Sequence, residues 1–242
     1  MDTAFALAIA RKIVVAKIYN QRRLVQRVAT SRRAEGSDVP TLVPEALTLL
    51  ERSMAAAGAA ESIDSLRGHE GLAAARYFNA WAALLPAEFP FERRSTRPPL
   101  NPVNATLSFT STLLYNETHA FIHSHGLDPA LGLLHTTENG RWSLALDLIE
   151  PFRPVLAEAL TLDLFSRKML NESHFEPQEG GIYLNRDGRA KLLLQYEKRM
   201  ERQFMSESAG HRTTIRQQLE NVAIHLKAAL NDPASFEPFL MN

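Results

Sequence analysis

Apolar side chains recur along most of the chain with the spacing of one face of an α-helix. Residues 2–29 show this most clearly, with Phe5, Ile9 and Ile13 four positions apart and no glycine or proline in the stretch. Since apolar residues at every third or fourth position are typical of amphipathic helices, the pattern predicts a long first helix. The same reasoning predicts further helices over 42–58, 61–67, 70–85, 102–125, 143–169, 186–205 and 210–230.

Segments rich in polar residues, glycine and proline separate these helices. Residues 30–41 and 86–100 are predicted loops, and the second contains four prolines and three arginines. Thr41 and Asn101 stand where helices begin, and their side-chain oxygens are suited to cap free backbone N–H groups. Pro102 follows Asn101 at the first helical position, where its missing N–H costs nothing.

The sequence also predicts shorter elements between the later helices. Residues 126–132 indicate a turn with a short helix, and residues 136–142 indicate a loop before a helix cap at Ser143. Two extended pieces, Ser173–Glu176 and Gly181–Leu184, predict a minor hairpin because turn residues lie between and around them.

Composition favours a globular helical protein. The chain of 242 residues is 45% hydrophobic, which is enough to bury a core, and it contains no cysteine. The lack of cysteine excludes disulfides, thiolate metal sites and a cysteine nucleophile. We therefore expect a single all-α domain over residues 1–242 with at most a minor hairpin. Residues 231–242 are expected to form a weakly ordered tail.

Charge is balanced overall but unevenly distributed. Residues 1–33 hold eight basic residues against one acid, whereas residues 101–159 hold two basic residues against six acids. A basic segment beside an acidic centre suits a polyanion and a metal cation, although a solvated helix face gives the same pattern. No stretch approaches the roughly 18 apolar residues of a membrane span, so we expect a soluble cytoplasmic protein with no membrane partner.

Acidic residues and a histidine in apolar surroundings are candidates for chemistry. Asp147 and Glu150 lie three positions apart in a Leu- and Ile-rich stretch, so a helix places both on one face. Such a pair needs a cation between its members, and either a divalent metal or Arg153 would serve. Glu70 opens a predicted helix and His135 follows an apolar run. A helix-start charge and a hydrogen-bonded structural histidine are the ordinary explanations of these two residues.

Glu70, His135 and Glu150 together supply two carboxylates and one imidazole. This mixture of oxygen and nitrogen donors suits Mg²⁺ or Mn²⁺, with water at the remaining positions. Residues so far apart in the sequence make a metal site only if the fold brings them together.

A rival metal site consists of three histidines, His119, His123 and His125. The first two are spaced to share one helical face, but no glutamate completes a His-Glu-x-x-His motif. A surface helix end is therefore the better explanation of this cluster. A serine hydrolase is not indicated either, since the Gly-x-Ser-x-Gly elbow is absent.

Four longer segments resemble one known family. In chain order they are GHEGLAAARYFNAW, RPPLNPVNATLSFTSTLLYNE, GLDPALGLLHTTENGRWSLALDLIEPFRP and GGIYLNRDGR. The motifs Gly-x-Glu-Gly with a following Tyr-Phe, Arg-Pro-Pro-x-x-Pro-Val-Asn and Asp-x-x-Glu-x-x-Arg-Pro are long and specific. From Asp2 to about Met205, the chain resembles the C-terminal helical domain of the CRISPR-associated adaptation integrase, the Cas-one family.

The resemblance implies a metal-dependent DNA endonuclease and integrase of CRISPR spacer acquisition. Such an enzyme joins the 3′-hydroxyl ends of a prespacer to the repeat array by transesterification. In that family a glutamate, a histidine and a later acid hold Mg²⁺ or Mn²⁺, and they match Glu70, His135 and Glu150. Asp147 matches a neighbouring acid that acts through an outer shell or a second metal, so these residues form the candidate catalytic set.

The resemblance also implies partners. These are double-stranded DNA with 3′ ends, CRISPR repeat DNA, a small ferredoxin-like adaptation protein (Cas-two) and a second copy of the chain. The first helix carries more apolar positions than one packing stripe needs, so we expect one of its faces to meet the second copy. The candidates for contacts to DNA phosphates are Arg22, Arg23, Arg93, Arg94 and Arg97.

Two departures from the family leave alternatives open, and one is that His123 and His125 stand where small or polar residues are expected. The family normally begins with a β-rich domain that helps it to dimerise, and this sequence starts almost directly in the helical region. We therefore expect an excised domain, a short integrase or part of a fusion, for instance with a reverse transcriptase. The alternative functions are a non-catalytic DNA-binding scaffold of the same fold and an unrelated helical metal hydrolase built on the three histidines. Acids clustered on an apolar helix argue against the scaffold.

Overall fold

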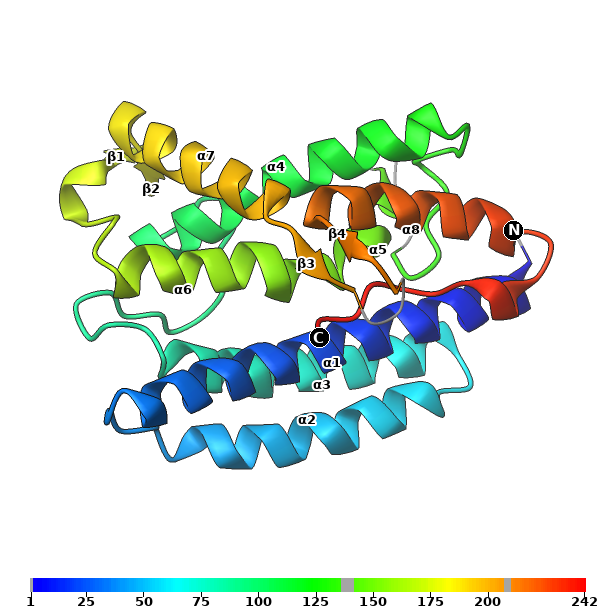
Figure 1. The fold of residues 1–242 in the computed structure, drawn as a ribbon, viewed down its shortest axis with the longest axis horizontal. Coiled ribbons are helices and arrows are strands. Elements are labelled where there is room, and N and C mark those ends of the chain that lie inside the picture. The colour runs from blue at the N-terminus through cyan, green and yellow to red at the C-terminus, as the bar shows by residue number, and fades with distance from the viewer. Residues whose placement is uncertain (1, 136–141, 207–209) are drawn as a thin grey trace.

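The fold begins with a layer of three long helices. A computed structural model describes residues 2–135, 142–206 and 210–242. In it, α1 (Thr3–Ala34), α2 (Leu42–Gly58) and α3 (Ile63–Ala82) lie side by side, as Figure 1 shows in blue and cyan. Val14, Ile18 and Leu50 are fully buried in this layer. Their removal from water is the main source of its stability.

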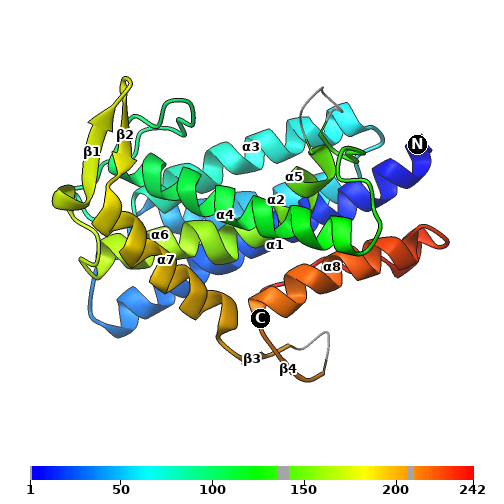
Figure 2. The same cartoon turned by 90° about the horizontal axis from the view of Figure 1, so that it is seen from above.

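A second group of helices covers this layer. α4 (Pro102–Ser124), α7 (Arg186–Glu201) and α8 (Ile215–Ala229) lie on its far side, seen from above in Figure 2. Between the two groups runs the chain from 143 to 166, which contacts both α1 and α4. Other helices cover this central stretch on both sides. Apolar side chains are therefore favoured at most of its positions.

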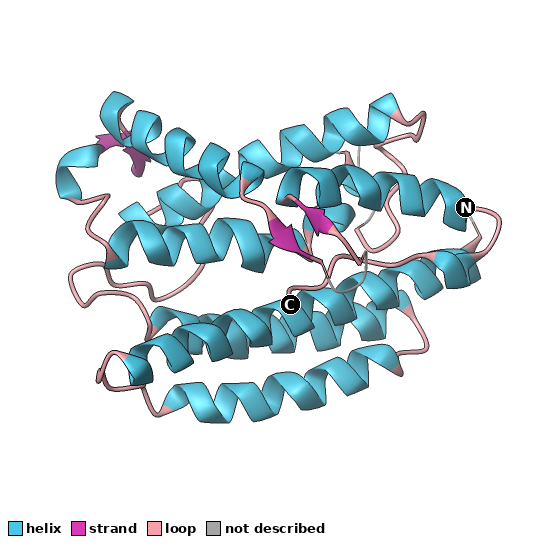
Figure 3. Cartoon of the chain, in the orientation of Figure 1, coloured by secondary structure: helices cyan, strands magenta, loops and turns pink. Residues whose placement is uncertain are grey.

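The predicted fold class is confirmed. Figure 3 shows helices throughout with only small pieces of strand. β1 (Phe175–Gln178) pairs antiparallel with β2 (Gly181–Leu184), which is the predicted hairpin shifted at its first strand. A second short pair, β3 (Phe204–Met205) with β4 (Arg212–Thr213), lies where the sequence predicted the end of one helix and the start of another.

Several predicted boundaries near the N-terminus are wrong. α1 continues to Ala34, through residues assigned to a loop. α3 is one helix where two were predicted, and Ser62 caps it by accepting a hydrogen bond from Ser65 N at 3.2 Å. Glu70 is therefore in the interior of a helix, and its explanation as a helix-start charge is wrong.

Of the three predicted helix caps, one is present. Asn101 accepts a hydrogen bond from Asn104 N at 2.8 Å, with Pro102 at the first helical position. Thr41 makes no side-chain cap bond, because its own backbone is already helical (φ −60°, ψ −27°). A side chain reaches the first free N–H groups only from an extended cap residue.

The predicted helix over 143–169 is interrupted. It consists of α5 (Ser143–Ile149), a π-helical turn η1 (Pro154–Glu158) and α6 (Ala159–Ser166). Proline has no N–H to donate to the carbonyl four residues earlier, and its ring clashes with that carbonyl, so Pro154 breaks the ladder at Glu150. Ser143 is the first helical residue rather than the cap. The short helix expected within 126–132 is absent there, and the loop predicted over 136–142 lies outside the described residues except for Trp142.

The C-terminal tail is packed rather than weakly ordered. Phe236 and Phe239 are buried, and the ring of Phe239 stacks on Phe152 with centroids 4.8 Å apart. The buried side chain of Asn20 on α1 donates to the Phe239 carbonyl at 3.0 Å and accepts from Met241 N at 2.7 Å. These polar contacts fix the tail along α1, as Figure 1 shows.

The apolar excess of α1 is used within the chain. Ile9, Ile13 and Leu24 are buried because α2, α3, η1 and the tail surround the helix. The expectation that α1 keeps a face for a second copy is therefore wrong for these residues. Phe5, which is half-buried, lines an apolar cavity of about 660 Å³ near the start of α1.

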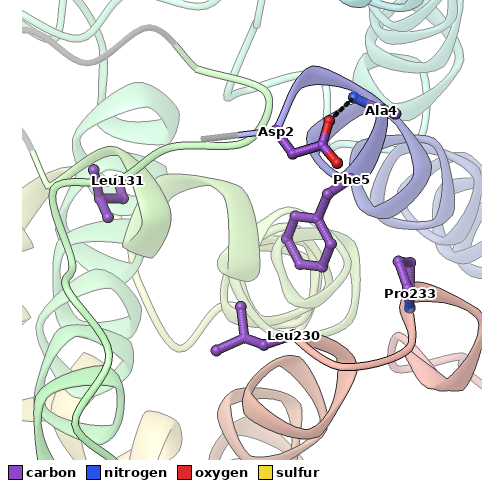
Figure 4. A pocket seen from close by; sticks show the side chains of 6 residues that line it. All are labelled: Asp2, Ala4, Phe5, Leu131, Leu230 and Pro233. Atoms are coloured by element: carbon purple, nitrogen blue, oxygen red, sulfur yellow. Dashed lines mark hydrogen bonds between the residues drawn. The ribbon is translucent and has the colours of Figure 1, made fainter.

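Figure 4 shows this larger cavity from close by. Its acid, Asp2, is engaged as the cap of α1, with its side chain accepting from Ala4 N at 2.9 Å. The other lining residues are Ala4, Phe5, Leu131, Leu230 and Pro233. Because these side chains are hydrocarbon, the cavity offers no group for acid–base or metal chemistry. None of the described helices is long and apolar enough to cross a membrane.

Candidate active site

A smaller cavity of about 250 Å³ brings the predicted metal ligands together. Glu70, His135 and Glu150 all line it, although 80 residues separate the first from the last. Arg67 and Leu134 complete the lining. These three side chains therefore line one cavity, which spacing alone could not establish.

Three elements supply the walls. Glu70 comes from the interior of α3, Glu150 from the C-terminal end of α5, and His135 from the segment before the undescribed residues 136–141. Pro154 stops the helical ladder just beyond Glu150, and the chain continues as the wider π-helical turn. π-Helical turns occur frequently at functional sites, since they let a helix redirect its side chains.

Lys17 of α1 lies between the two glutamates. Its Nζ is 2.5 Å from Glu150 Oε2 and also donates to Glu70 Oε1. The side chain of Lys17 is 11% exposed. Burial opposes its charge, but Glu150 and Glu70 outweigh this effect and raise the pKa of Lys17. Lys17 was missed from the sequence, where a lysine inside the apolar run VVAKI was the available signal.

A second cation holds the other oxygen of Glu150. Arg153 Nε lies 2.9 Å from Glu150 Oε1, and Arg153 was one of the two cations that the sequence left open. Burial alone would raise the pKa of Glu150, but Arg153 and Lys17 lower it to about 2. Glu150 is therefore an anion at neutral pH despite being only 5% exposed.

Asp147 does not share the cavity wall with Glu150 but braces His135. Its fully buried carboxylate accepts hydrogen bonds from Leu133 N at 2.5 Å and from Leu134 N and His135 N at 3.0 Å. It also contacts His135 Nδ1 at 2.5 Å. This geometry leaves Nε2 as the ring nitrogen available to a ligand. Asp147 therefore positions His135 and does not itself line the cavity.

The environment of His135 favours its protonated form in the absence of a bound cation. The hydrogen bond to Asp147 raises the pKa of His135, and burial works against that rise. Arg67 ties the same segment to α3 by donating from Nε to the Leu134 carbonyl at 2.8 Å. Together Asp147 and Arg67 hold His135 against the wall that carries Glu70.

The donor set fits a hard divalent cation. Two carboxylates and one imidazole, the last braced by a carboxylate, are the ligands and outer shell that Mg²⁺ or Mn²⁺ sites use. Among the described residues, however, no three His, Asp or Glu side chains converge to coordinating geometry. The ammonium of Lys17 lies between Glu70 and Glu150 and offsets part of their negative charge, as a metal ion there would.

A further buried acid lies close to this network. Glu158 of η1 accepts a hydrogen bond from Tyr77 OH at 2.6 Å, and both residues are buried. Burial raises the pKa of Glu158 to about 7, although the bond from Tyr77 acts in the opposite direction. This pair could not be predicted from local sequence, because Tyr77 and Glu158 belong to helices far apart in the chain.

The five predicted DNA-binding arginines lie in different surroundings. Arg93 and Arg97 are exposed in the connector after α3. Arg22 pairs with Glu51 at 3.3 Å, and Arg23 donates to Gln26 at 3.2 Å. Arg94 is half-buried. Of the five, Arg93 and Arg97 are therefore the most accessible to a polyanion.

Arg94 is held by the first turns of α4. It donates to Asn104 Oδ1 at 2.9 Å and to Ser108 Oγ at 3.1 Å. Burial, followed by the charge of Arg153, lowers its pKa to about 10, so Arg94 stays a cation at neutral pH. These contacts give Arg94 a structural task in fixing the connector.

The three histidines of the rival cluster are engaged separately. His119 stacks on Trp142 with ring centroids 3.6 Å apart. His123 lies parallel to His119 at 6.4 Å, and His125 Nε2 meets Glu220 Oε1 at 3.2 Å. These separate contacts leave no shared centre for a metal ion in the described structure.

Sequence comparisons identify the chain's relatives. Residues 1–198 match the family model described as CRISPR associated protein Cas1. The chain is 39% identical to CRISPR-associated endonuclease Cas1 2 of Rhodospirillum rubrum over 236 residues, covering 92% of this chain and 68% of that protein. It is 37% identical to CRISPR-associated endonuclease Cas1 3 of Thermus thermophilus, covering 99% of this chain and 68% of the relative.

Solved structures agree with this finding. A Cas6-RT-Cas1–Cas2 complex matches with a TM-score of 0.85 at 26% identity, covering 98% of this chain and 25% of that chain. A Cas1 protein from Thermotoga maritima matches with a TM-score of 0.79 at 27% identity, covering 97% of this chain and 68% of that one. A casposase bound to its integration product shares the fold, with a TM-score of 0.80 at 22% identity.

Proposed function

The chain belongs to the CRISPR-associated Cas1 family, and we propose that it is a metal-dependent DNA endonuclease and integrase. In this proposal it joins the 3′-hydroxyl ends of a prespacer to CRISPR repeat DNA. The observation that carries it is the meeting of Glu70, His135 and Glu150 on one cavity, with Asp147 bracing the histidine. Named relatives of similar sequence are CRISPR-associated endonucleases, which supports the same activity.

In this proposal Glu70, Glu150 and His135 would hold the cation in the cavity. Glu70 and Glu150 would bind through carboxylate oxygens and His135 through Nε2, since its Nδ1 faces Asp147. When bound, Mg²⁺ or Mn²⁺ lowers the pKa of a hydroxyl or water and stabilises negative charge at the phosphodiester. Arg153 keeps Glu150 ionised and in position.

The proposed reaction is an exchange of one phosphodiester for another. The 3′-oxygen of the prespacer forms a new bond to a phosphorus of the repeat, and its proton leaves. The bond from that phosphorus to the 3′-oxygen of the repeat strand breaks, and that oxygen takes up a proton. When water replaces the attacking hydroxyl, the same exchange is hydrolysis, which is endonuclease activity.

The DNA contacts are proposed for the basic residues named from the sequence. Arg93 and Arg97 are the best supported because their exposed guanidinium groups lie on the connector between α3 and α4. Contacts to phosphate position a duplex without reading its sequence. Arg22, Arg23 and Arg94 would have to share their donors with the protein partners they already have.

We also propose a Cas2 partner and a Cas1 homodimer. The Cas6-RT-Cas1–Cas2 complexes that this chain resembles support the partner. One site of the described kind serves one DNA end, and integration joins two ends, so a second copy is needed. Because Ile9, Ile13 and Leu24 of α1 are buried within the chain, these side chains do not supply the dimer contacts.

Strand transfer by purified alanine variants tests the proposed function. Glu70→Ala, His135→Ala and Glu150→Ala should each lose integration of a 3′-ended duplex in Mn²⁺ or Mg²⁺, because each removes one of few ligands. Glu45→Ala, which changes an exposed glutamate on α2, is the matched control. Circular dichroism establishes that the variants are folded. Wild-type rates in two of the three site variants would contradict the assignment.

A further inference from the structure

We propose that Lys17 is a built-in counter-cation that joins Glu70 to Glu150 when no divalent ion is bound and competes with that ion for them. The inference rests on the proposed metal site. It gives Lys17 a positioning role rather than a catalytic one. Three separate elements, α1, α3 and α5, meet through this one ammonium group.

The first support is geometric. The ammonium contacts an oxygen of each glutamate at once, and the side chains of Lys17, Glu70 and Glu150 are 11%, 24% and 6% exposed. Two carboxylates in such a place repel each other unless a cation lies between them. Lys17 supplies that cation from the chain itself, so the site does not depend on metal to stay assembled.

The second support is the balance of charge. Glu70 and Glu150 carry two negative charges, and Lys17 and Arg153 carry two positive ones, so these four side chains are neutral as a group. A divalent ion added to them would create an excess of two positive charges. Repulsion between a divalent ion and a neighbouring ammonium is strong where water is largely excluded. The ion and Lys17 therefore cannot hold the same carboxylate oxygens together.

The third support is the room to move. The cavity of about 250 Å³ is lined by both glutamates. A lysine side chain has a flexible stem of four methylene groups, and rotation about its bonds can move the ammonium. The stem of Lys17 can stay packed on α1 while the ammonium leaves the carboxylates. An arginine would not suit this role as well, because its planar fork holds a carboxylate through two bonds.

Competition between Lys17 and a divalent ion for the two glutamates predicts the direction of two effects. Removing the ammonium should strengthen the binding of a divalent ion, since both carboxylates become fully available. It should also weaken the metal-free protein, because two buried anions lose their counter-ion. A residue with a merely structural role would lower stability without tightening metal binding.

Isothermal titration of the protein with Mn²⁺ in the absence of DNA measures the first effect. We expect Lys17→Met to bind Mn²⁺ about tenfold more tightly than the wild type, within the usual range of coupling between two ligands. Thermal unfolding with a chelator should show Lys17→Met melting below the wild type, and saturating Mn²⁺ should recover most of the difference. Lys191→Met, which removes an exposed lysine of α7, is the control and should match the wild type in both measurements.

A second variant keeps the test decisive if Lys17→Met does not fold. Lys17→Arg retains the charge but holds the glutamates through a fork, so it should bind Mn²⁺ more weakly than the wild type and unfold like it in chelator. Equal or weaker Mn²⁺ binding by folded Lys17→Met, or wild-type Mn²⁺ binding by Lys17→Arg, would overturn the role of Lys17 alone. Failure of the wild type itself to bind Mn²⁺ would overturn the metal site and, with it, this inference.

Discussion

Glu150 directly follows α5 and Glu158 is the last residue of the π-helical turn η1, and both are almost fully buried, at 5% and 4% exposed. Their chemistry is opposite. Glu150 meets two cations, Lys17 and Arg153, and its pKa falls to about 2. Glu158 meets the neutral hydroxyl of Tyr77, and burial raises its pKa to about 7.

The difference shows that burial alone does not decide the charge of an acid. Desolvation acts on both residues in the same direction, and the result is decided by their partners, Arg153 and Lys17 for Glu150 and Tyr77 for Glu158. An ionised carboxylate on a cavity can hold a cation. A carboxyl whose pKa is raised to about 7 is partly protonated at neutral pH, and with its bond to a tyrosine it acts as part of the core.

The largest expected effect separates the two acids by activity. Glu150→Gln should lower Mn²⁺-dependent strand transfer at least about 100-fold, because a neutral amide is a poor ligand for a hard divalent ion. Glu158→Gln should stay within a few-fold of the wild type, because its amide oxygen can still accept from Tyr77. Both variants are assayed with the same 3′-ended duplex. A comparable loss of strand transfer in Glu158→Gln would contradict the assignment of different roles to Glu150 and Glu158.

The pH dependence of stability should follow Glu158. Its pKa in the folded state, about 7, lies above its ordinary value of 4.5. The folded protein therefore binds this proton more tightly than the unfolded chain does. The stability it contributes is present below pH 4.5 and is lost as the pH rises through 7. The expected loss is on the order of 3 kcal/mol, as a shift of this size implies.

Urea unfolding at a series of pH values measures this loss. Glu158→Gln should flatten the curve between pH 4.5 and 7, because the amide does not titrate. Glu150 works in the other direction: its lowered pKa contributes stability above pH 4.5 that is lost as the pH falls towards 2. A wild-type curve that rises from pH 4.5 to 7 with the same slope in Glu158→Gln would show that other groups dominate.

A third buried carboxylate sharpens the comparison. Asp147→Asn should reduce strand transfer about tenfold, since outer-shell partners of a ligand typically affect metal affinity or activity by that order. It should also lower the pKa of His135, because the hydrogen bond that the ring donates to Asp147 is the main cause of its rise. NMR titration of the His135 ring in metal-free protein measures the second effect. An unchanged titration would mean that Asp147 supports only the backbone of residues 133–135.

The smallest expected effect concerns two arginines of the connector. Arg97→Ala should reduce the slope of log binding constant against log salt by about one, because an exposed guanidinium that meets a phosphate releases one counterion. Arg94→Ala should change the slope less and the stability more, since Arg94 is bonded to Asn104 and Ser108. Equal slopes for Arg97→Ala and the wild type would indicate that the connector faces away from DNA.

The sequence predicted the fold class and the separate site residues, because helical periodicity and local motifs are properties of neighbouring positions. Glu70, His135 and Glu150 were found in this way and lie on one cavity. Helix boundaries were less predictable. Nothing local distinguishes residues 30–34 from a loop, and Pro154 broke the α-helical ladder, after which the chain continues as a π-helical turn.

The roles that depend on tertiary contact could not be predicted from the sequence. Lys17 stands 53 residues from Glu70 and 133 from Glu150 in the chain, so only the packing of α1 against α3 and α5 shows that it bridges them. The pairing of Tyr77 with Glu158 has the same character. Asp147 and Glu150 looked equivalent on a helix face, but one binds the 133–135 backbone and the other faces the cavity.

The most direct test of the metal site is a crystal of the protein soaked in Mn²⁺ and measured for anomalous scattering. We expect one strong peak in the cavity, within bonding distance of Glu70, His135 and Glu150, and the ammonium of Lys17 withdrawn from the glutamates. A map at saturating Mn²⁺ with no peak in that cavity, or with its strongest peak at His119 and His123, would contradict the assignment of this site as the metal centre.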